Sequence, residues 1–174
     1  MLPNTTLEVT TMYDMLLKGG TVLDPSQNIH RKLDVATIGD KISRIAPSIA
    51  ANESYQVVNV DGKLVTPGLV DLHTHVYTPG GNPNHPDFAG VWGGVTSVAD
   101  AGGAGSDNFQ DFCEVVLPQA QTTVYSFLSI FRDRTDPLNF SASDMDVPGV
   151  VRIAKENPGQ VKGVKVLVYN RVVQ

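Results

Sequence analysis

Two histidines separated by one residue, His73 and His75, are the side chains in this sequence best suited to chemistry. They follow the apolar run 69–72, which comes after a Pro-Gly turn and predicts a β-strand. Successive side chains of a strand point to opposite faces, so we expect both imidazoles to point the same way. Imidazoles that converge from one strand can bind a single metal ion. A bare His-x-His pair can equally consist of two exposed or hydrogen-bonded histidines.

Lys165 is the second candidate, because it lies late in the apolar run 161–168, which predicts a strand. An ammonium ion buried there would lose its water, which favours the neutral amine. A neutral amine can react with carbon dioxide to give a carbamate, an anionic ligand with two oxygens that can bridge two metals. The alternative is a packed stem whose charged head reaches solvent. Lys162 has the opposite parity, so we expect it to face solvent or a helix.

Other polar side chains follow the predicted strands. Asp100 precedes a glycine-rich turn and is a substrate-side candidate, although an aspartate at such a position often caps the turn. Tyr77 has the parity of the two histidines and is the other substrate-side candidate. Asp71 has this parity too, and either orients an imidazole or forms a hydrogen-bonded plug below the site. His85 is a single loop histidine, which we expect to be solvated.

The first part of the chain predicts a small all-β unit at residues 13–66. Residues 1–12 are polar and without period, which predicts a loose N-terminus. Residues 13–23 carry apolar side chains around Gly19-Gly20, which predicts two short strands joined by a turn. Further strands are predicted at residues 34–38, 41–45 and 55–60. The first two of these flank Gly39-Asp40, a two-residue connection typical of a hairpin.

From Pro67 onward, apolar runs alternate with helical patterns, which predicts parallel β/α units. Strands are expected at residues 69–72, 95–99, 123–131 and 161–168. A closed barrel of eight units takes about 250 residues, or roughly 31 per unit. The 108 residues from Pro67 to Gln174 suffice for about three and a half units. The predicted fold class is therefore α/β: a partial (β/α)8 barrel, residues 67–174, preceded by a small N-terminal β-sandwich unit.

Two longer helices are expected between these strands. The apolar stripe of the first consists of Phe109, Phe112, Cys113 and Val116. Asp107 with Gln110 is expected to form its capping box. The stripe of the second consists of Val147, Val150, Val151 and Ala154. Ser143 with Asp146 is expected to cap it. A short helix is expected around residues 88–92.

Composition and charge exclude several classes of function. The chain of 174 residues is 41% hydrophobic and 18% charged, which is ordinary for a folded domain. A net charge of −5 without a basic run gives no support for binding nucleic acid or an anionic membrane. No stretch reaches the roughly 18 apolar residues of a membrane-spanning helix, and no export signal is evident. The single cysteine, Cys113, predicts a buried thiol in a reducing compartment, so a cytoplasmic protein is expected.

The sequence PGLVDLHTH, residues 67–75, resembles the first barrel strand of the amidohydrolase superfamily. HVY and GGVTSVADAGGAGSDNF resemble its dihydroorotase-like deacetylase branch, and the similarity extends from about residue 13 to the last residue. This resemblance implies that His73 and His75 ligate a divalent metal at the mouth of a (β/α)8 barrel. It also implies that Lys165, within GVKV, is a carboxylated lysine that bridges two metal ions, zinc being the expected metal. The implied activity is metal-dependent hydrolysis of a small amide or ester, and the full-length protein is expected to be a homo-oligomer.

The resemblance also implies ligands that this chain lacks. In the superfamily, a histidine after strand five, another after strand six and an aspartate after strand eight complete the site. Strands five to eight are not present, so we expect an N-terminal fragment that is itself inactive, and we assign no catalytic residue within it. The general-base aspartate is expected beyond residue 174.

Two alternatives remain open. Leu167 stands where relatives often carry a basic or polar residue, which leaves a cyclic amide hydrolase of the dihydroorotase or hydantoinase kind as one alternative. The other is a non-catalytic half-barrel that pairs with a copy of itself or with another chain.

Overall fold

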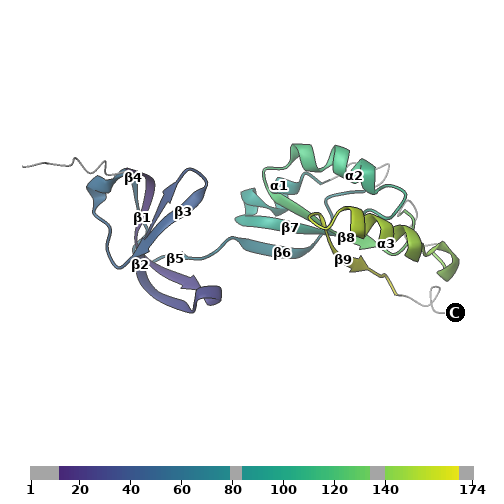
Figure 1. Ribbon diagram of the computed structural model, residues 1–174, viewed down its shortest axis with the longest axis horizontal. Helices are drawn as coiled ribbons and strands as arrows, with labels where there is room; N and C mark the ends of the chain where they lie inside the picture. The colour runs from purple at the N-terminus through teal and green to yellow at the C-terminus, as the bar shows by residue number, and fades with distance from the viewer. Residues whose placement is uncertain (1–11, 79–83, 134–139, 169–174) are drawn as a thin grey trace, which may run out of the picture. The chain divides into compact units, whose positions relative to one another are not determined.

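The computed structural model describes residues 12–78, 84–133 and 140–168. The chain divides into two compact units, Met1–Pro67 and Gly68–Gln174. Both are drawn in Figure 1. The candidate site lies in the second unit.

The first unit is built on one β-sheet with the order β3-β2-β1-β4, in which β5 also pairs with β1. Its strands are β1 (Tyr13–Asp24), β2 (Ile29–Ile38), β3 (Lys41–Ala46), β4 (Ser54–Asn59) and β5 (Leu64–Val65). Short 3-10 helices are found at Pro25–Gln27 and Ala51–Glu53. The β1 strand is antiparallel to β2 but parallel to β4 and β5. The all-β content is as predicted, and the sandwich arrangement remains a prediction.

The predicted turn at Gly19-Gly20 is wrong, because β1 runs through both glycines as one strand. Its register with β2 shifts between Leu17 and Gly20. Gly19 has a φ of 84°, which favours glycine, and its N–H donates to Asp34 Oδ1 over 2.8 Å. A bulge held by the buried Asp34 carboxylate therefore takes the place of the turn.

The hairpin at Gly39-Asp40 is confirmed, since Ile38 pairs with Lys41 across this two-residue connection. Gly39 has a φ of 57°, as a tight hairpin turn requires. The strand expected at residues 55–60 is confirmed as β4, shifted by one residue.

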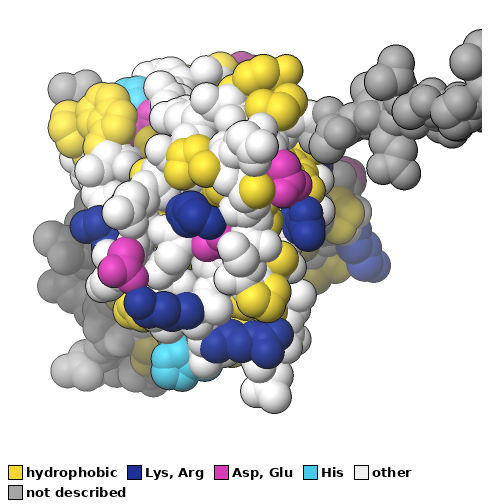
Figure 2. Space-filling view, turned by 90° about the vertical axis from the view of Figure 1, so that its left-hand side faces the viewer, with side chains coloured by type: hydrophobic (Ala, Val, Ile, Leu, Met, Phe, Trp, Pro, Cys, Tyr) yellow, Lys and Arg dark blue, Asp and Glu magenta, His cyan; other side chains and the backbone are white. Residues whose placement is uncertain are grey.

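The outer surface of the first unit carries charges of both signs. Figure 2 shows Lys and Arg side chains interspersed with acidic, apolar and other side chains. Ion pairs join Lys32 to Asp61 at 2.7 Å and Arg44 to Glu53 at 3.3 Å. Exposed pairs of this kind contribute little to stability.

The second unit contains a four-stranded parallel sheet with the order β6-β7-β8-β9. Its strands are β6 (Leu69–Thr74), β7 (Val95–Ala101), β8 (Thr123–Ser129) and β9 (Val161–Lys165). The helices between them are α1 (Pro86–Ala89), α2 (Phe109–Val115) and α3 (Val147–Glu156). Short 3-10 helices are found at Val91–Gly93, Leu117–Gln119 and Ala142–Asp144. The predicted α/β class with a parallel sheet is confirmed, and β9 ends three residues earlier than expected.

The main core of this unit lies between one face of the sheet and the helices (Figure 1). Val98 on β7 and Leu128 on β8 are fully buried in it, against Phe109 and Phe112 of α2 and Val150 of α3. The predicted stripe of α2 is thereby confirmed at both phenylalanines. Side chains with the same parity as Val98 and Leu128 therefore face the helices, and their immediate neighbours in the strands face the opposite side.

The predicted capping box of α2 is wrong. The helix begins after Asn108, whose Oδ1 accepts a hydrogen bond from the Gly105 N–H at 2.7 Å instead of capping the helix. Gln110 bonds to Glu114 on the exposed side of the helix at 2.9 Å. The asparagine is therefore used by the preceding glycine-rich turn.

The start of α3 also differs from the prediction. Asp146, not Ser143, is the N-cap, and its carboxylate accepts from the Gly149 N–H at 3.2 Å. The buried stripe includes Val150 and Ile153, whereas Val147 and Val151 are 53% and 45% exposed. The covered face of α3 is therefore formed by Val150 and Ile153 and not by Val147 and Val151.

None of the helices within the described ranges is long and apolar enough to cross a membrane.

Candidate metal site

The two histidines lie at the carboxyl end of β6, on the face of the sheet that the helices do not cover. Thr74 pairs with the buried Asp100, which has the parity of Val98 and so faces the helices. Strand alternation therefore directs His73 to the opposite face. The rings of His73 and His75 are exposed and have centroids 5.5 Å apart at an interplanar angle of 73°.

The spacing of this pair fits a shared metal ion. Zn–N bonds of about 2.0–2.1 Å and tetrahedral angles put the centroids of two imidazoles on one zinc ion about 5 Å apart. Among the residues that the structure describes, no group of three or more His, Cys, Asp or Glu side chains is arranged to hold a metal. The pair could therefore supply two ligands to a metal ion, and a third ligand from the described residues would have to be another kind of side chain.

Lys165 lies on the same face as His73. It is the last residue of β9 and pairs with Ser129 of β8, whose neighbour Leu128 faces the helices. A Cβ atom on residue 102 would lie 2.8 and 2.7 Å from the Cβ and Cγ atoms of Lys165. Gly102 belongs to the turn after β7, so the lysine stem leans from β9 past β8 towards the end of β7. This direction leads towards the histidines on β6.

Lys165 is less buried than the carbamate argument expects, because the residue is only half-buried. Its neighbours Val164 and Val166 are 48% and 44% exposed, since β9 pairs with one strand only in the described sheet. Lys162 is exposed, as predicted, and its Nζ donates to the Pro158 carbonyl at 3.3 Å.

Asp100 is fully buried, and its carboxylate accepts hydrogen bonds from backbone N–H groups. Its Oδ1 accepts hydrogen bonds from the N–H groups of Val76 and Tyr77 at 3.0 and 3.2 Å, and its Oδ2 accepts from Gly103 at 2.6 Å. Burial raises the pKa of Asp100, and these N–H donors and the nearby His75 oppose the rise. The structure does not support a substrate-side position; it agrees with the alternative that Asp100 caps the glycine turn.

Tyr77 also lies away from the open face. It is 4% exposed, its ring contacts that of Phe112 edge-on at 5.7 Å, and its hydroxyl donates to Asp111 at 2.6 Å. Burial, followed by the hydrogen bond to Asp111, raises the pKa of Tyr77 well above its ordinary value. The parity argument does not hold at this residue because β6 ends at Thr74 and the chain then turns into the core.

The predicted parity of Asp71 is wrong. It pairs with Val98 and so faces the helices, and the register shifts between Asp71 and Thr74. The extra residue places His73 on the other face. Asp71 Oδ1 accepts from the backbone N–H of His73 at 2.9 Å, so this contact restrains the main chain of His73 and not its ring.

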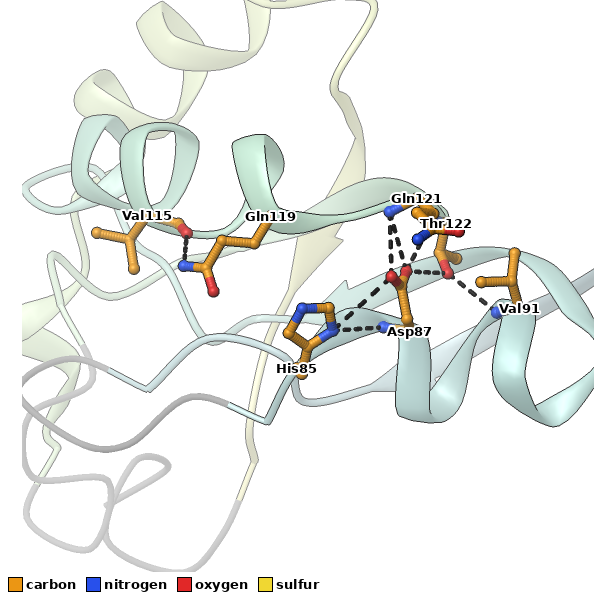
Figure 3. A network of polar contacts seen from close by, with 7 residues as sticks. All are labelled: His85, Asp87, Val91, Val115, Gln119, Gln121 and Thr122. Carbon is orange, nitrogen blue, oxygen red and sulfur yellow. Dashed lines mark hydrogen bonds and ion pairs between the residues drawn. The ribbon is translucent and has the colours of Figure 1, made fainter.

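His85 takes part in a separate polar network, shown in Figure 3, and the prediction that it is simply solvated is wrong. Its Nδ1 accepts from the Asp87 N–H at 3.3 Å, and its ring stacks on Trp92 with centroids 5.4 Å apart. Asp87 is 1% exposed and accepts from the Gln121 and Thr122 N–H groups at 3.0 and 2.8 Å. It also accepts from the Thr122 hydroxyl at 2.7 Å, which is the main reason that its pKa is lowered.

Two residues at the site have roles that the sequence did not suggest. Gly102 provides the space for the Lys165 stem, and Asn84 Nδ2 donates to the backbone carbonyl of His75 at 3.2 Å. The sequence Gly102-Gly103 could have indicated a close contact with another segment, because glycine has no side chain. An asparagine in a loop is too common to indicate a role at the site. A hollow of about 430 Å³ opens beside His75 and is lined by Thr74, His75, Val76, Asn84, Phe88 and Ala89.

Comparisons with known proteins agree with the sequence resemblance. No family model matches the chain. A dihydroorotase of Geotalea daltonii is 38% identical over 90 residues, which are 49% of this chain and 21% of that protein. A deacetylase of Agrobacterium fabrum is 29% identical over 141 residues, 76% of this chain and 34% of that protein.

A solved dihydroorotase structure matches with a TM-score of 0.75 and 25% identity, over 91% of this chain and 43% of the other. The resemblance to the amidohydrolase superfamily is confirmed. The chain spans 21% and 34% of the lengths of the two curated relatives within the superfamily. The names of these relatives, a dihydroorotase and a deacetylase, agree with the hydrolase class expected from the sequence.

Proposed function

We propose that this chain contributes to the active site of a metal-dependent hydrolase that cleaves a small amide or ester, in the manner of a deacetylase. His73 and His75 would be zinc ligands, and Lys165, once carboxylated, would bridge two zinc ions. The observation that carries the proposal is the pair of exposed imidazoles 5.5 Å apart on the face towards which the Lys165 stem extends.

Neighbouring residues support this role because they restrain the backbone of the two histidines and leave room for the Lys165 side chain. The Asp71 carboxylate holds the His73 N–H, and Asn84 holds the His75 carbonyl, so the backbone of both proposed ligands is restrained. The half-buried Lys165 has a stem in van der Waals contact and a head able to meet dissolved carbon dioxide. Bound zinc would supply a water of lowered pKa and polarise the carbonyl of the substrate.

The site proposed here needs further residues. Two imidazoles and one carbamate do not complete two zinc sites, and no general base is assigned among the described residues. We propose that the second unit is the first half of a (β/α)8 barrel, that strands five to eight bring the remaining ligands and the aspartate base, and that the 174-residue chain alone is inactive. The complete protein would be cytoplasmic and a homo-oligomer.

A cyclic amide hydrolase is the second candidate. It is favoured by the 38% identity to a dihydroorotase across the 90 residues matched. The deacetylase match is weaker in identity but covers 76% of the chain. The two candidates share the metal site and differ in the substrate that the remaining residues select.

The test is an assay of the longest natural polypeptide that contains this chain, with zinc and bicarbonate. Substrates are N-acetylated amino acids, acetyl esters, dihydroorotate and a hydantoin. We expect zinc-dependent hydrolysis of one of these classes and a loss of at least about 100-fold in kcat/KM in His73→Ala, since a zinc ligand is removed. The control is His30→Ala, which replaces an exposed histidine of the first unit and should leave the rate unchanged.

Activity that survives chelation of the metal, or His73→Ala with the rate of the unsubstituted protein, would contradict the proposal. Robust zinc-dependent turnover by the 174-residue chain alone would contradict the part that assigns the remaining ligands to other residues.

A further inference from the structure

Asp100 is placed between the two halves of the candidate metal site. It lies on β7, which is hydrogen-bonded to β6 on one side and to β8 on the other. The histidines lie on the β6 side. The Lys165 stem reaches the turn that follows β7 from the opposite side.

The Asp100 carboxylate makes hydrogen bonds in both directions. Through Oδ1 it accepts from the N–H groups of Val76 and Tyr77, the two residues that directly follow His75. Through Oδ2 it accepts from Gly103, which adjoins the glycine on which the Lys165 stem packs. A single rigid side chain thus ties the end of the histidine strand to the turn beneath the lysine.

The burial of Asp100 separates this role from substrate binding. The residue is 0% exposed and both carboxylate oxygens are engaged by main-chain N–H groups, so a substrate in the open hollow has no access to it. A carboxylate that accepts several backbone N–H groups is a strong fixed link, because charge-assisted hydrogen bonds are about twice as strong as neutral ones.

We propose that Asp100 is a positioning residue of the metal site: it sets the distance between the His73 and His75 ligand pair and the Lys165 ligand. This inference rests on the proposed function. Loss of the link would let the segment after His75 and the Gly102-Gly103 turn move independently, and metal affinity would fall without loss of any ligand.

Asp87 provides a matched control within the same unit. It is also almost fully buried, and it also accepts main-chain N–H groups, those of Gln121 and Thr122 (Figure 3). These residues precede the first residue of β8, at the end of the sheet opposite to the site. Asp87→Asn and Asp100→Asn therefore each replace a buried carboxylate that accepts main-chain N–H groups, one at the end of the sheet opposite to the proposed ligands and one between them.

The experiment measures the zinc affinity of the longest natural polypeptide that contains this chain, in bicarbonate buffer, by competition with a coloured chelator. We expect Asp100→Asn to weaken zinc binding about 10- to 100-fold, as loss of residues that orient metal ligands typically does. Asp87→Asn should bind zinc like the unsubstituted chain. Equal zinc affinity in Asp100→Asn and Asp87→Asn would overturn the inference and leave the proposed function standing, whereas absence of zinc binding by the unsubstituted polypeptide would overturn both.

A second measurement needs no substitution and serves if Asp100→Asn does not fold. Hydrogen exchange of the unsubstituted chain is followed with and without zinc. We expect zinc to slow exchange of the Val76, Tyr77 and Gly103 amides together, because the same carboxylate holds them, and to leave the Gln121 and Thr122 amides unchanged. Zinc binding without any change at the three Asp100-bonded amides would overturn the inference.

Discussion

The inner and outer strands of the four-stranded sheet differ in how much of their apolar surface is covered. On the inner strands, Val98 of β7 and Leu128 of β8 are 0% exposed. On the outer strands, Leu72 of β6 is 61% exposed and Val164 of β9 is 48% exposed. The inner strands have a neighbour on each side, whereas each outer strand has one neighbour within the described sheet.

This difference matters because all three proposed metal ligands are on the outer strands. His73 is in β6, His75 follows it, and Lys165 ends β9. The inner strands provide buried residues such as Asp100 of β7, and the outer strands provide the proposed metal ligands. A parallel strand with an open edge and exposed apolar side chains is a surface that other strands can cover.

The largest expected effect concerns the inner strands. Leu128→Ala should lower the free energy of unfolding of the second unit by about 2–5 kcal/mol, because it leaves a cavity in the covered core. Leu72→Ala, its matched control on an outer strand, should change that free energy by about 0.5 kcal/mol or less. Urea denaturation followed by circular dichroism measures both. Equal losses in the two variants would contradict the distinction between covered and open strands.

An intermediate effect is expected on self-association. Leu72→Lys places a charge on the exposed side of β6, where it should suppress strand-edge pairing without lowering the stability of the second unit by more than about 0.5 kcal/mol. Light scattering as a function of concentration should show less association than in the unsubstituted chain. Phe88→Lys, an exposed aromatic outside the strands, is the comparison. An unsubstituted chain that stays monomeric at high concentration would show that the open edge of β6 does not promote self-association.

The smallest expected effect is the pH dependence of the stability that Asp87 of α1 contributes by holding the main chain before β8. The Thr122 hydroxyl, with neighbouring N–H groups, holds the pKa of Asp87 below its ordinary value. Asp87 thus contributes stability at pH values above about 4, and that contribution disappears as the pH falls through the lowered pKa of the folded state. The stability difference between the unsubstituted chain and Asp87→Asn should be constant near neutral pH and shrink below about pH 4. A difference that grows on acidification would contradict this sign.

The sequence predicted the strands of the second unit well, because apolar runs separated by helical patterns leave few alternatives. The ends of the elements were less predictable. Asp107 and Ser143 have the right types for caps, yet Asn108 and Asp146 precede the helices, because neighbouring turns compete for the same side chains. At Gly19-Gly20 a bulge and a turn have the same composition, and only the distant Asp34 decides between them.

For the site, alternation along the strand predicted that His73 and His75 point the same way, but it did not predict the positions on either side of irregular backbone. The register shift after Asp71 moved that aspartate to the other face, and the end of β6 moved Tyr77 into the core. The local sequence predicts neither the register shift nor the end of β6, because both depend on the pairing with the neighbouring strand. The exposure of Lys165 depends on the number of neighbouring strands, which an apolar run does not reveal.

The central claim, that His73, His75 and Lys165 form one metal site, is tested most directly by the bicarbonate dependence of zinc binding. A carbamate on Lys165 forms only when carbon dioxide is supplied, so bicarbonate should strengthen zinc binding by the unsubstituted chain. Lys165→Ala should bind zinc weakly and without this dependence, and His73→Ala should lose most of the binding. Zinc binding that is indifferent to bicarbonate and equal in Lys165→Ala and the unsubstituted chain would contradict the claim.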